Sequence, residues 1–213
     1  MAKRDAPATA EPARLRRRLT LEERSVGARQ AIFEAAAKVV GEHGYADASI
    51  ARITEAAGIA QGTFYLYFAS RQALFDELLP HVGQDMLDFI RSRIHGAANV
   101  YEMEESAFRA FFAFLKSNPG FFRVLNEAEV ASPAAHRTHF KLLSEHYVES
   151  LSRSVQAGEI RRYDRDELET LAYMFMAARS YLYLLHVKAK GGSGALPKKV
   201  VETYMKLIRN GLT

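Results

Sequence analysis

The chain has 213 residues, of which 48% are hydrophobic and 25% are charged, with a formal net charge of +4 and no cysteine. These values fit one compact globular unit or two small lobes. They exclude a disulfide framework, a thiolate metal site and a cysteine nucleophile.

The first 19 residues are rich in Ala and Pro and contain the basic residues Arg16, Arg17 and Arg18. Such an arm indicates either a polyanionic partner or a solvated tail. It contains no apolar run of signal-peptide length, and the longest apolar run, residues 171–187, is interrupted and too short for a membrane span. We therefore expect a cytoplasmic protein without a membrane partner.

The next residues predict helices with clear end signals. Thr20-Leu-Glu-Glu23 matches a capping box, and apolar residues then recur at helical spacing until Gly44. Ser49 can cap a second helix that ends at Gly58. Residues 60–68 predict a third, short helix.

Ser70 can cap a fourth helix, which Pro80 is expected to kink. Further helices are expected through the apolar stripe before Asn118, over 121–130, over 132–157, from Asp164 to about 190, and over 196–208. Residues 191–194 read as a flexible glycine-rich break. No strand-like alternation appears, so the predicted fold is all-α, with about nine helices.

The stretch GIAQGTFYLYF, residues 58–68, follows the second helix directly. Two short helices joined by a glycine-containing turn are typical of a helix-turn-helix, whose second helix enters the major groove of DNA. Phe64 and Phe68 can pack inward, and Gly62 costs a helix about 1 kcal/mol relative to Ala. The missing side chain lets the backbone approach a phosphate or base edge. The outward side carries Gln61, Gly62, Thr63, Leu66 and Tyr67.

Residues 48–75, ASIARITEAAGIAQGTFYLYFASRQALF, resemble the DNA-binding segment of TetR-family transcriptional regulators, and GEHGYADAS before them matches as well. The resemblance covers residues 30–79. It implies a helix-turn-helix domain over 20–70, after a flexible basic arm over 1–19. A helical effector-binding and dimerisation domain would follow over 71–213.

The resemblance also implies roles for single residues. Ser49 and Arg71 would hold phosphate, Gln61, Gly62, Thr63 and Leu66 would face bases, and Tyr65 and Tyr67 would contact the backbone or base edges. Chemically, Gln61 can pair with adenine and Leu66 can meet a thymine methyl. Two alternatives stay open: the tyrosines can be packing residues, and the arm can enter a minor groove or only collect near phosphates. Ala60 departs from the family pattern because it lacks the capping oxygen of the frequent Ser.

For the larger domain, the resemblance implies a homodimer that binds a palindromic double-stranded operator and is released by a small-molecule effector, usually as a repressor. The last two long helices would form the dimer interface. No cofactor, metal or enzymatic activity is expected.

Aromatic and thioether side chains could line an effector pocket, although most of them can equally be core. Arg179 is the exception, because a buried charge is costly unless it is paired. It either pairs with Glu127 or Glu129, or holds a carboxylate or phosphate of an aromatic or acyl-type effector. The candidate ligand-binding residues are Phe108, Phe111, Phe112, Phe122, Leu125, Tyr173, Met176, Arg179 and Tyr183.

Two other functions stay open. A metal-responsive regulator would use His136, His139 and His146 with Glu145, since i, i+3 spacing can place two imidazoles on one face. A helical ligand carrier or protein-interaction module would explain the residues after Gly96 but not Gly62 behind a basic arm.

Overall fold

The computed structural model describes residues 21–190 and 196–212, and within them it contains helices and no strand, so the predicted all-α class is confirmed. The α-helices are α1 (Leu21–Asp47), α2 (Ile50–Ala57), α3 (Gln61–Phe64), α4 (Arg71–Ile94), α5 (Val100–Ser117), α6 (Phe121–Ala131), α7 (Pro133–Gln156), α8 (Leu168–His186) and α9 (Lys198–Leu212). Two 3₁₀ turns, η1 (Arg165–Glu167) and η2 (Lys188–Lys190), flank α8.

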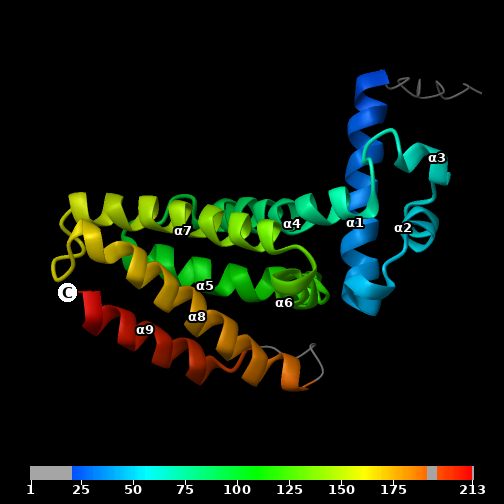
Figure 1. The fold of residues 1–213 in the computed structure, drawn as a ribbon. Helices are drawn as coiled ribbons and strands as arrows, with labels where there is room; N and C mark the ends of the chain where they lie inside the picture. Colours follow the sequence, from blue (N-terminus) through cyan, green and yellow to red (C-terminus); the bar gives the residue numbers. More distant parts are fainter. Residues whose placement is uncertain (1–20, 191–195, 213) are drawn as a thin grey trace, which may run out of the picture.

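The helices form a small head and a long body (Figure 1). The head consists of α1, which runs across the end of the body, together with α2 and α3 on its far side. The body is a bundle of α4–α9, and α4 connects it to the head. No helix of the described part of the chain is long and apolar enough to cross a membrane.

The caps predicted in the head are present. The Ser49 Oγ accepts a hydrogen bond from the Arg52 amide, and Gly58 ends α2 in the left-handed conformation, with φ of 67°. Gly44 has φ of 84° and interrupts the regular helix near the end of α1. The expected capping box begins at Thr20, which lies outside the described residues.

The third helix is shorter than predicted. α3 ends at Phe64, and residues 65–67 form a turn closed by bonds such as Tyr67 N–H to Phe64 O at 3.0 Å. Ala60 makes no side-chain cap bond, so the helix start lacks the usual stabilisation. Burial of Phe64 and Phe68, at 0% and 2% exposure, holds the segment in place instead.

The Ser70 Oγ caps α4 by accepting from the Ala73 amide at 3.1 Å, and the helix is continuous through Pro80. Farther along α4, a Cβ added at Gly83 would lie 2.3 Å from the Nδ1 of His139 on α7. Any side chain there would collide with the imidazole. Glycine therefore permits the close approach of α4 and α7.

The long helix expected from Asp164 to about 190 is divided. Asp164 accepts from the Asp166 amide, and Glu167 accepts from the Asp164 amide, which completes a capping box on η1. α8 itself begins at Leu168 and ends at His186. The predicted glycine-rich break, residues 191–194, lies outside the described residues.

Buried side chains form two clusters. The first joins head and body, since it contains Phe33 and Phe68 of the head together with Leu79 and Phe122 of the body. The second lies among α5, α7, α8 and α9, with Phe108 near its centre. The core is thus continuous across residue 70, where the sequence suggests a domain boundary.

Candidate DNA-reading surface and effector cavity

Residues of α3 and the turn after it form an exposed tip on the head. Leu66 is 79% exposed and Tyr65 is 57% exposed, and Gln61 and Gly62 are also exposed. A Cβ added at Gly62 would meet nothing within 4 Å, so packing within the chain does not require glycine there. The tip therefore presents to solvent the bare backbone of Gly62 and the apolar side chain of Leu66.

The two tyrosines differ in their surroundings. The Tyr65 ring lies edge-on to Phe64 at 5.4 Å but remains largely exposed. Tyr67 is partly buried and packs against the first core cluster. This arrangement favours the packing interpretation for Tyr67 more than for Tyr65.

The two proposed phosphate contacts also have roles within the protein. The Ser49 Oγ is occupied as the cap of α2, and the residue is half-buried. Arg71 donates from Nη1 to the Ala46 carbonyl at 3.2 Å and lies over the Phe75 ring at 5.5 Å. Arg71 thereby joins the start of α4 to the end of α1. Arg16, Arg17 and Arg18 lie outside the described residues.

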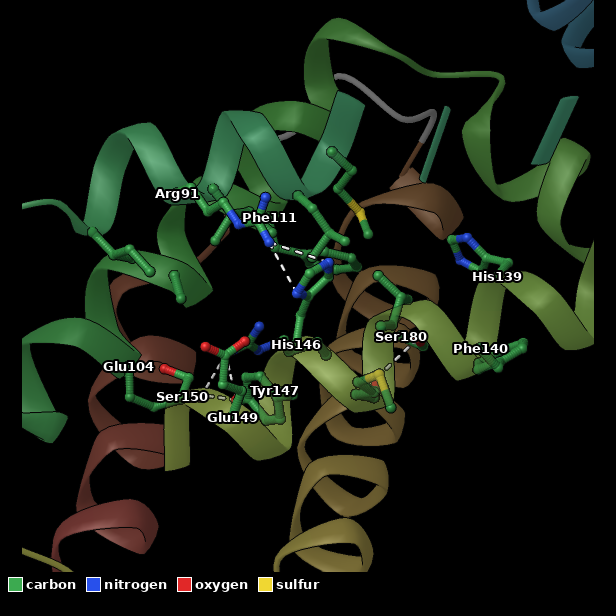
Figure 2. A pocket seen from close by; sticks show the side chains of 18 of the residues that line it. Arg91, Glu104, Phe111, His139, Phe140, His146, Tyr147, Glu149, Ser150 and Ser180 are labelled. Carbon is green, nitrogen blue, oxygen red and sulfur yellow. Dashed lines mark hydrogen bonds and ion pairs between the residues drawn. The ribbon is translucent and has the colours of Figure 1, made fainter. Parts of the chain in front are cut away.

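The body contains a cavity of about 230 Å³ between α4, α5, α6, α7 and α8 (Figure 2). Its interior is mainly apolar and aromatic, and its polar residues come from α4, α5, α7 and α8. The apolar lining includes Met86, Leu87, Ile90, Ile94, Met103, Ala107, Phe111, Phe121, Phe122, Leu125, Phe140, Leu143 and Met176.

The structure brings part of the predicted ligand-binding set to this cavity: Phe111, Phe122, Leu125, Met176 and Arg179. The other members lie elsewhere. Phe108 stacks on Tyr204 at 4.1 Å in the second cluster, and Phe112 lies edge-on to Phe111.

Tyr183 stacks on the outer side of the aromatic lining, with its ring 4.4 Å from that of Phe122. Tyr173 is 42% exposed on α8 and does not line the cavity. Four predicted ligand-binding residues therefore do not line the cavity: Phe108, Phe112, Tyr173 and Tyr183. The orientation of α5 and α8 about their axes places these side chains in the core or at the surface instead. Sequence reasoning missed the α4 and α7 residues, although the apolar stripe of α4 from Leu74 to Ile94 signals an inward face.

Arg179 is buried and paired, but with a residue that the sequence did not suggest. Its Nη2 donates to the Glu104 Oε1 at 2.6 Å and to the Tyr147 hydroxyl at 2.7 Å. Glu104 also accepts from Tyr147 at 2.6 Å and from Tyr204 at 2.5 Å. Glu127, expected as a partner, instead pairs with Arg123. Of the two alternatives left open for Arg179, the structure contains an ion pair, but the partner is Glu104 and neither Glu127 nor Glu129.

This network fixes the protonation states of its members. Burial alone would lower the pKa of Arg179, but the adjacent Glu104 carboxylate raises it well above its ordinary value. Burial raises the pKa of the Tyr147 and Tyr204 hydroxyls, so both stay protonated and donate to Glu104. Since Glu104 already neutralises Arg179, an anionic effector would gain little from this guanidinium.

Other cations lie nearer to solvent along the cavity. Arg91 of α4 reaches toward His146 of α7, with 2.9 Å between its Nη2 and the His146 Nδ1 (Figure 2). Arg153 also lines the cavity and pairs with Glu149 at 3.0 Å. Arg91 also pairs with Asp88 at 3.2 Å, but the Arg91 and Arg153 side chains are 48% and 66% exposed, so unlike Arg179 both keep access to water and to a ligand head group.

The histidines considered for a metal site all lie on α7. His139 is 1% exposed, and burial lowers its pKa to about 4, so the ring is neutral near pH 7. Its Nδ1 has no hydrogen-bond partner among the described residues. Residues 21–190 and 196–212 contain no group of three or more potential ligands arranged to hold a metal ion.

Residues 32–78 match the family model described as bacterial regulatory proteins, tetR family. The chain thus contains a TetR-family DNA-binding domain. The matched segment contains the whole exposed tip described above.

Curated relatives include the uncharacterised HTH-type regulator YvdT of Bacillus subtilis, 44% identical over 70 residues, or 33% of this chain and 36% of YvdT. The match thus spans about a third of that relative. The HTH-type transcriptional repressor KstR2 of Mycobacterium tuberculosis is 24% identical over 194 residues, or 85% of this chain and 91% of KstR2.

Solved structures of TetR-like regulators share the fold over most of the chain. FadR from Bacillus halodurans superposes with a TM-score of 0.70 at 22% identity, covering 87% of this chain and 96% of its own. FadR from Bacillus subtilis, solved in complex with stearoyl-CoA, gives 0.69 at 18% identity, covering 86% and 99%.

Proposed function

We propose that this regulator is a repressor that binds a palindromic operator as a homodimer and leaves it when an apolar effector with an anionic head group occupies the cavity. The observation that carries the proposal is the position of α4. This helix lines the cavity through Met86 and Ile90, and it begins at Arg71, directly after the exposed tip. An effector therefore contacts the helix that connects the body to the DNA-reading head.

The head supplies the DNA contacts in this proposal. Gln61, Thr63 and Leu66 face base edges, Gly62 allows close approach of the backbone, and Tyr65 contacts the duplex from the exposed side. Ser49, Arg71 and Tyr67 position the head against phosphates, and the arm residues Arg16, Arg17 and Arg18 add electrostatic attraction.

The exposed faces of α8 and α9 supply the dimer contact. Met174, Tyr181 and Leu185 are 60%, 74% and 64% exposed, and they recur on one face of α8. Leu207 of α9 is 68% exposed. Apolar side chains in one such patch are typical of an interface, and a two-fold dimer suits two operator half-sites. Leu171 and Phe175 of α8 are buried in the second core cluster instead.

The lining of the cavity defines the effector class. Aromatic and aliphatic side chains fill its interior, Arg179 is neutralised by Glu104, and Arg91 and Arg153 remain partly exposed along it. An effector would therefore place its apolar body inside and its anionic head beside Arg91 and Arg153. The stearoyl-CoA bound to Bacillus subtilis FadR has this polarity, which supports the class without fixing the compound.

The test begins with selection of binding sequences from a random duplex library on the ligand-free protein. We expect an enriched palindrome, with an affinity that falls steeply as salt rises because phosphate contacts release counterions. Long-chain acyl-CoA is then added to the complex, and anisotropy measures release. Failure to enrich any sequence would overturn the regulatory function, while retention of the duplex with acyl-CoA bound would overturn effector control by this class.

A further inference from the structure

Helix α6 has one face in the cavity and another against the head. Phe122 and Leu125 line the cavity, whereas Arg123 and Glu127 are directed toward the end of α1. α6 is only 11 residues long, so these two sets of side chains are within two turns of each other. A shift of α6 that begins at its cavity face therefore also moves the residues that contact α1.

The contact with α1 consists of direct hydrogen bonds. Arg123 donates from Nη1 to the Glu42 carbonyl at 2.7 Å and from Nε to the Glu127 carboxylate at 2.7 Å. The second oxygen of Glu127 accepts from the Tyr45 amide at 2.8 Å. Partial burial would raise the pKa of Glu127, but the bonds from Arg123 and Tyr45 hold it below its ordinary value. The pair is thus charged, and it bonds to the backbone of Glu42 and Tyr45 on either side of Gly44.

Two glycines make this contact close. A Cβ at Gly44 would lie 2.7 Å from the Glu127 Oε2 and 2.8 Å from the Arg123 Nη2. A Cβ at Gly41 would lie 2.6 Å from the Gly120 Cα, just before α6. The end of α1 therefore meets the backbone directly before α6 at Gly41, and at Gly44 it lies against the Arg123 and Glu127 side chains, so a movement of α6 reaches α1 through these contacts.

The other end of α6 is tied to α4. The Gln72 Nε2 donates to the Ala131 carbonyl at 3.1 Å, and the Ser132 hydroxyl donates to the Asp76 carboxylate at 2.5 Å. Ser132 is fully buried. α6 thus contacts both helices that flank α2 and α3, and so it can turn the reading tip relative to the body.

We propose that Arg123 and Glu127 are positioning residues that couple occupancy of the cavity to the orientation of the DNA-reading head. An occupant displaces Phe122 and Leu125, α6 moves with them, and the ion pair carries that movement to Glu42 and Tyr45 of α1. The inference rests on the proposed function, because it concerns how that same cavity controls operator binding.

The test replaces the unidentified effector by a side chain. Ala107 is 5% exposed and lines the cavity from α5, so Ala107→Phe fills part of the space from within. Operator affinity is measured by anisotropy on the selected duplex, with and without Ala107→Phe, in three backgrounds: unaltered, Glu127→Ala and Glu129→Ala. Glu129 is an exposed carboxylate on the same helix and serves as the matched control. The readout is the ratio of the two dissociation constants, which a purely structural role of Glu127 would not change.

We expect filling of the cavity to weaken operator binding by about 5- to 100-fold in the unaltered and Glu129→Ala backgrounds. In Glu127→Ala the ratio should fall toward one, and Glu127→Gln, which keeps an acceptor for the Tyr45 amide, should restore part of it. Thermal unfolding of each variant establishes that the fold is intact. Equal ratios in Glu127→Ala and Glu129→Ala would overturn the inference and leave the proposed function standing. No effect of Ala107→Phe in the unaltered background, together with no release by bound acyl-CoA, would overturn both.

Discussion

Glu104 of α5 and Arg179 of α8 form an ion pair with 2.6 Å between Oε1 and Nη2 and with side-chain exposures of 1% and 6%. The pair joins helices whose residues are 75 positions apart in the sequence. Because both side chains are buried, water cannot solvate the charge that remains when its partner is removed. The pair therefore has a much larger effect on stability when one member is removed than when both are.

We predict that Glu104→Gln lowers the free energy of unfolding by about 3–5 kcal/mol, because Arg179 then remains buried without a counter-charge. The double variant Glu104→Gln with Arg179→Met should recover much of this loss. Urea unfolding monitored by circular dichroism measures both. Lys141→Ala, which breaks an exposed pair with Glu145, is the control and should change stability by less than about 1 kcal/mol. A Glu104→Gln variant as stable as that control would contradict the prediction.

Gly62→Ala should leave the fold intact and weaken binding to DNA. The added methyl group meets nothing within 4 Å in the free protein, and Ala favours helix by about 1 kcal/mol over Gly. On a duplex the same methyl group would occupy the space of a close backbone approach. Thermal unfolding and anisotropy on the selected operator separate the two effects. Operator affinity equal to that of the unaltered protein would show that the tip does not approach DNA through Gly62.

The cations along the cavity predict a preference for anionic probes. 1-Anilinonaphthalene-8-sulfonate and N-phenyl-1-naphthylamine share an apolar body and differ in the sulfonate group. The anionic probe should bind more tightly, and Arg91→Ala should remove about 1–2 kcal/mol of that preference because a charge-assisted hydrogen bond is lost. Fluorescence titration measures both affinities. Arg109→Ala, an exposed arginine on α5 that does not line the cavity, is the control. An unchanged preference in Arg91→Ala would place the head group elsewhere.

His139 predicts a loss of stability at mildly acidic pH. Burial lowers its pKa to about 4 in the folded protein, so between pH 6.5 and 4 the unfolded chain binds a proton that the folded chain does not. Stability from this group is thus present above pH 6.5 and is lost as the pH falls. We expect His139 to contribute about 2 kcal/mol of destabilisation between pH 7 and pH 5.

Urea unfolding at the two pH values measures this effect in the unaltered protein, in His139→Phe and in the control His95→Gln, whose histidine is exposed. The pH dependence should shrink in His139→Phe and persist in the control. Equal pH dependence in all three proteins would show that His139 titrates normally.

Local chemistry explains what the sequence predicted well. Ser49, Gly58 and Ser70 act within one or two turns of their own position, so their caps were visible without tertiary information. The same holds for the exposed tip, whose composition is unusual in itself. The length of α3 was overestimated, because the pattern of Phe64 and Phe68 fits one helical turn followed by a tight turn as well as it fits a longer helix.

The cavity could be predicted only in part. Phe111 and Phe112 are adjacent in sequence, yet one lines the cavity and the other lies between the two clusters. Which of them faces inward depends on the rotation of α5 against its neighbours. The partner of Arg179 and the contact of His139 with Gly83 likewise depend on which helices pass each other, and no local pattern encodes that.

The continuous core beneath the head has a consequence for how the molecule melts. Phe33 and Phe68 share one buried cluster with Leu79 and Phe122, so the reading head has no separate interior of its own. The head and the body should then unfold in a single cooperative step rather than one after the other. A fragment ending at residue 70 would expose Phe33 and Phe68 to water where they now contact the body. Under the proposed function, operator binding and effector binding would then be lost at the same temperature.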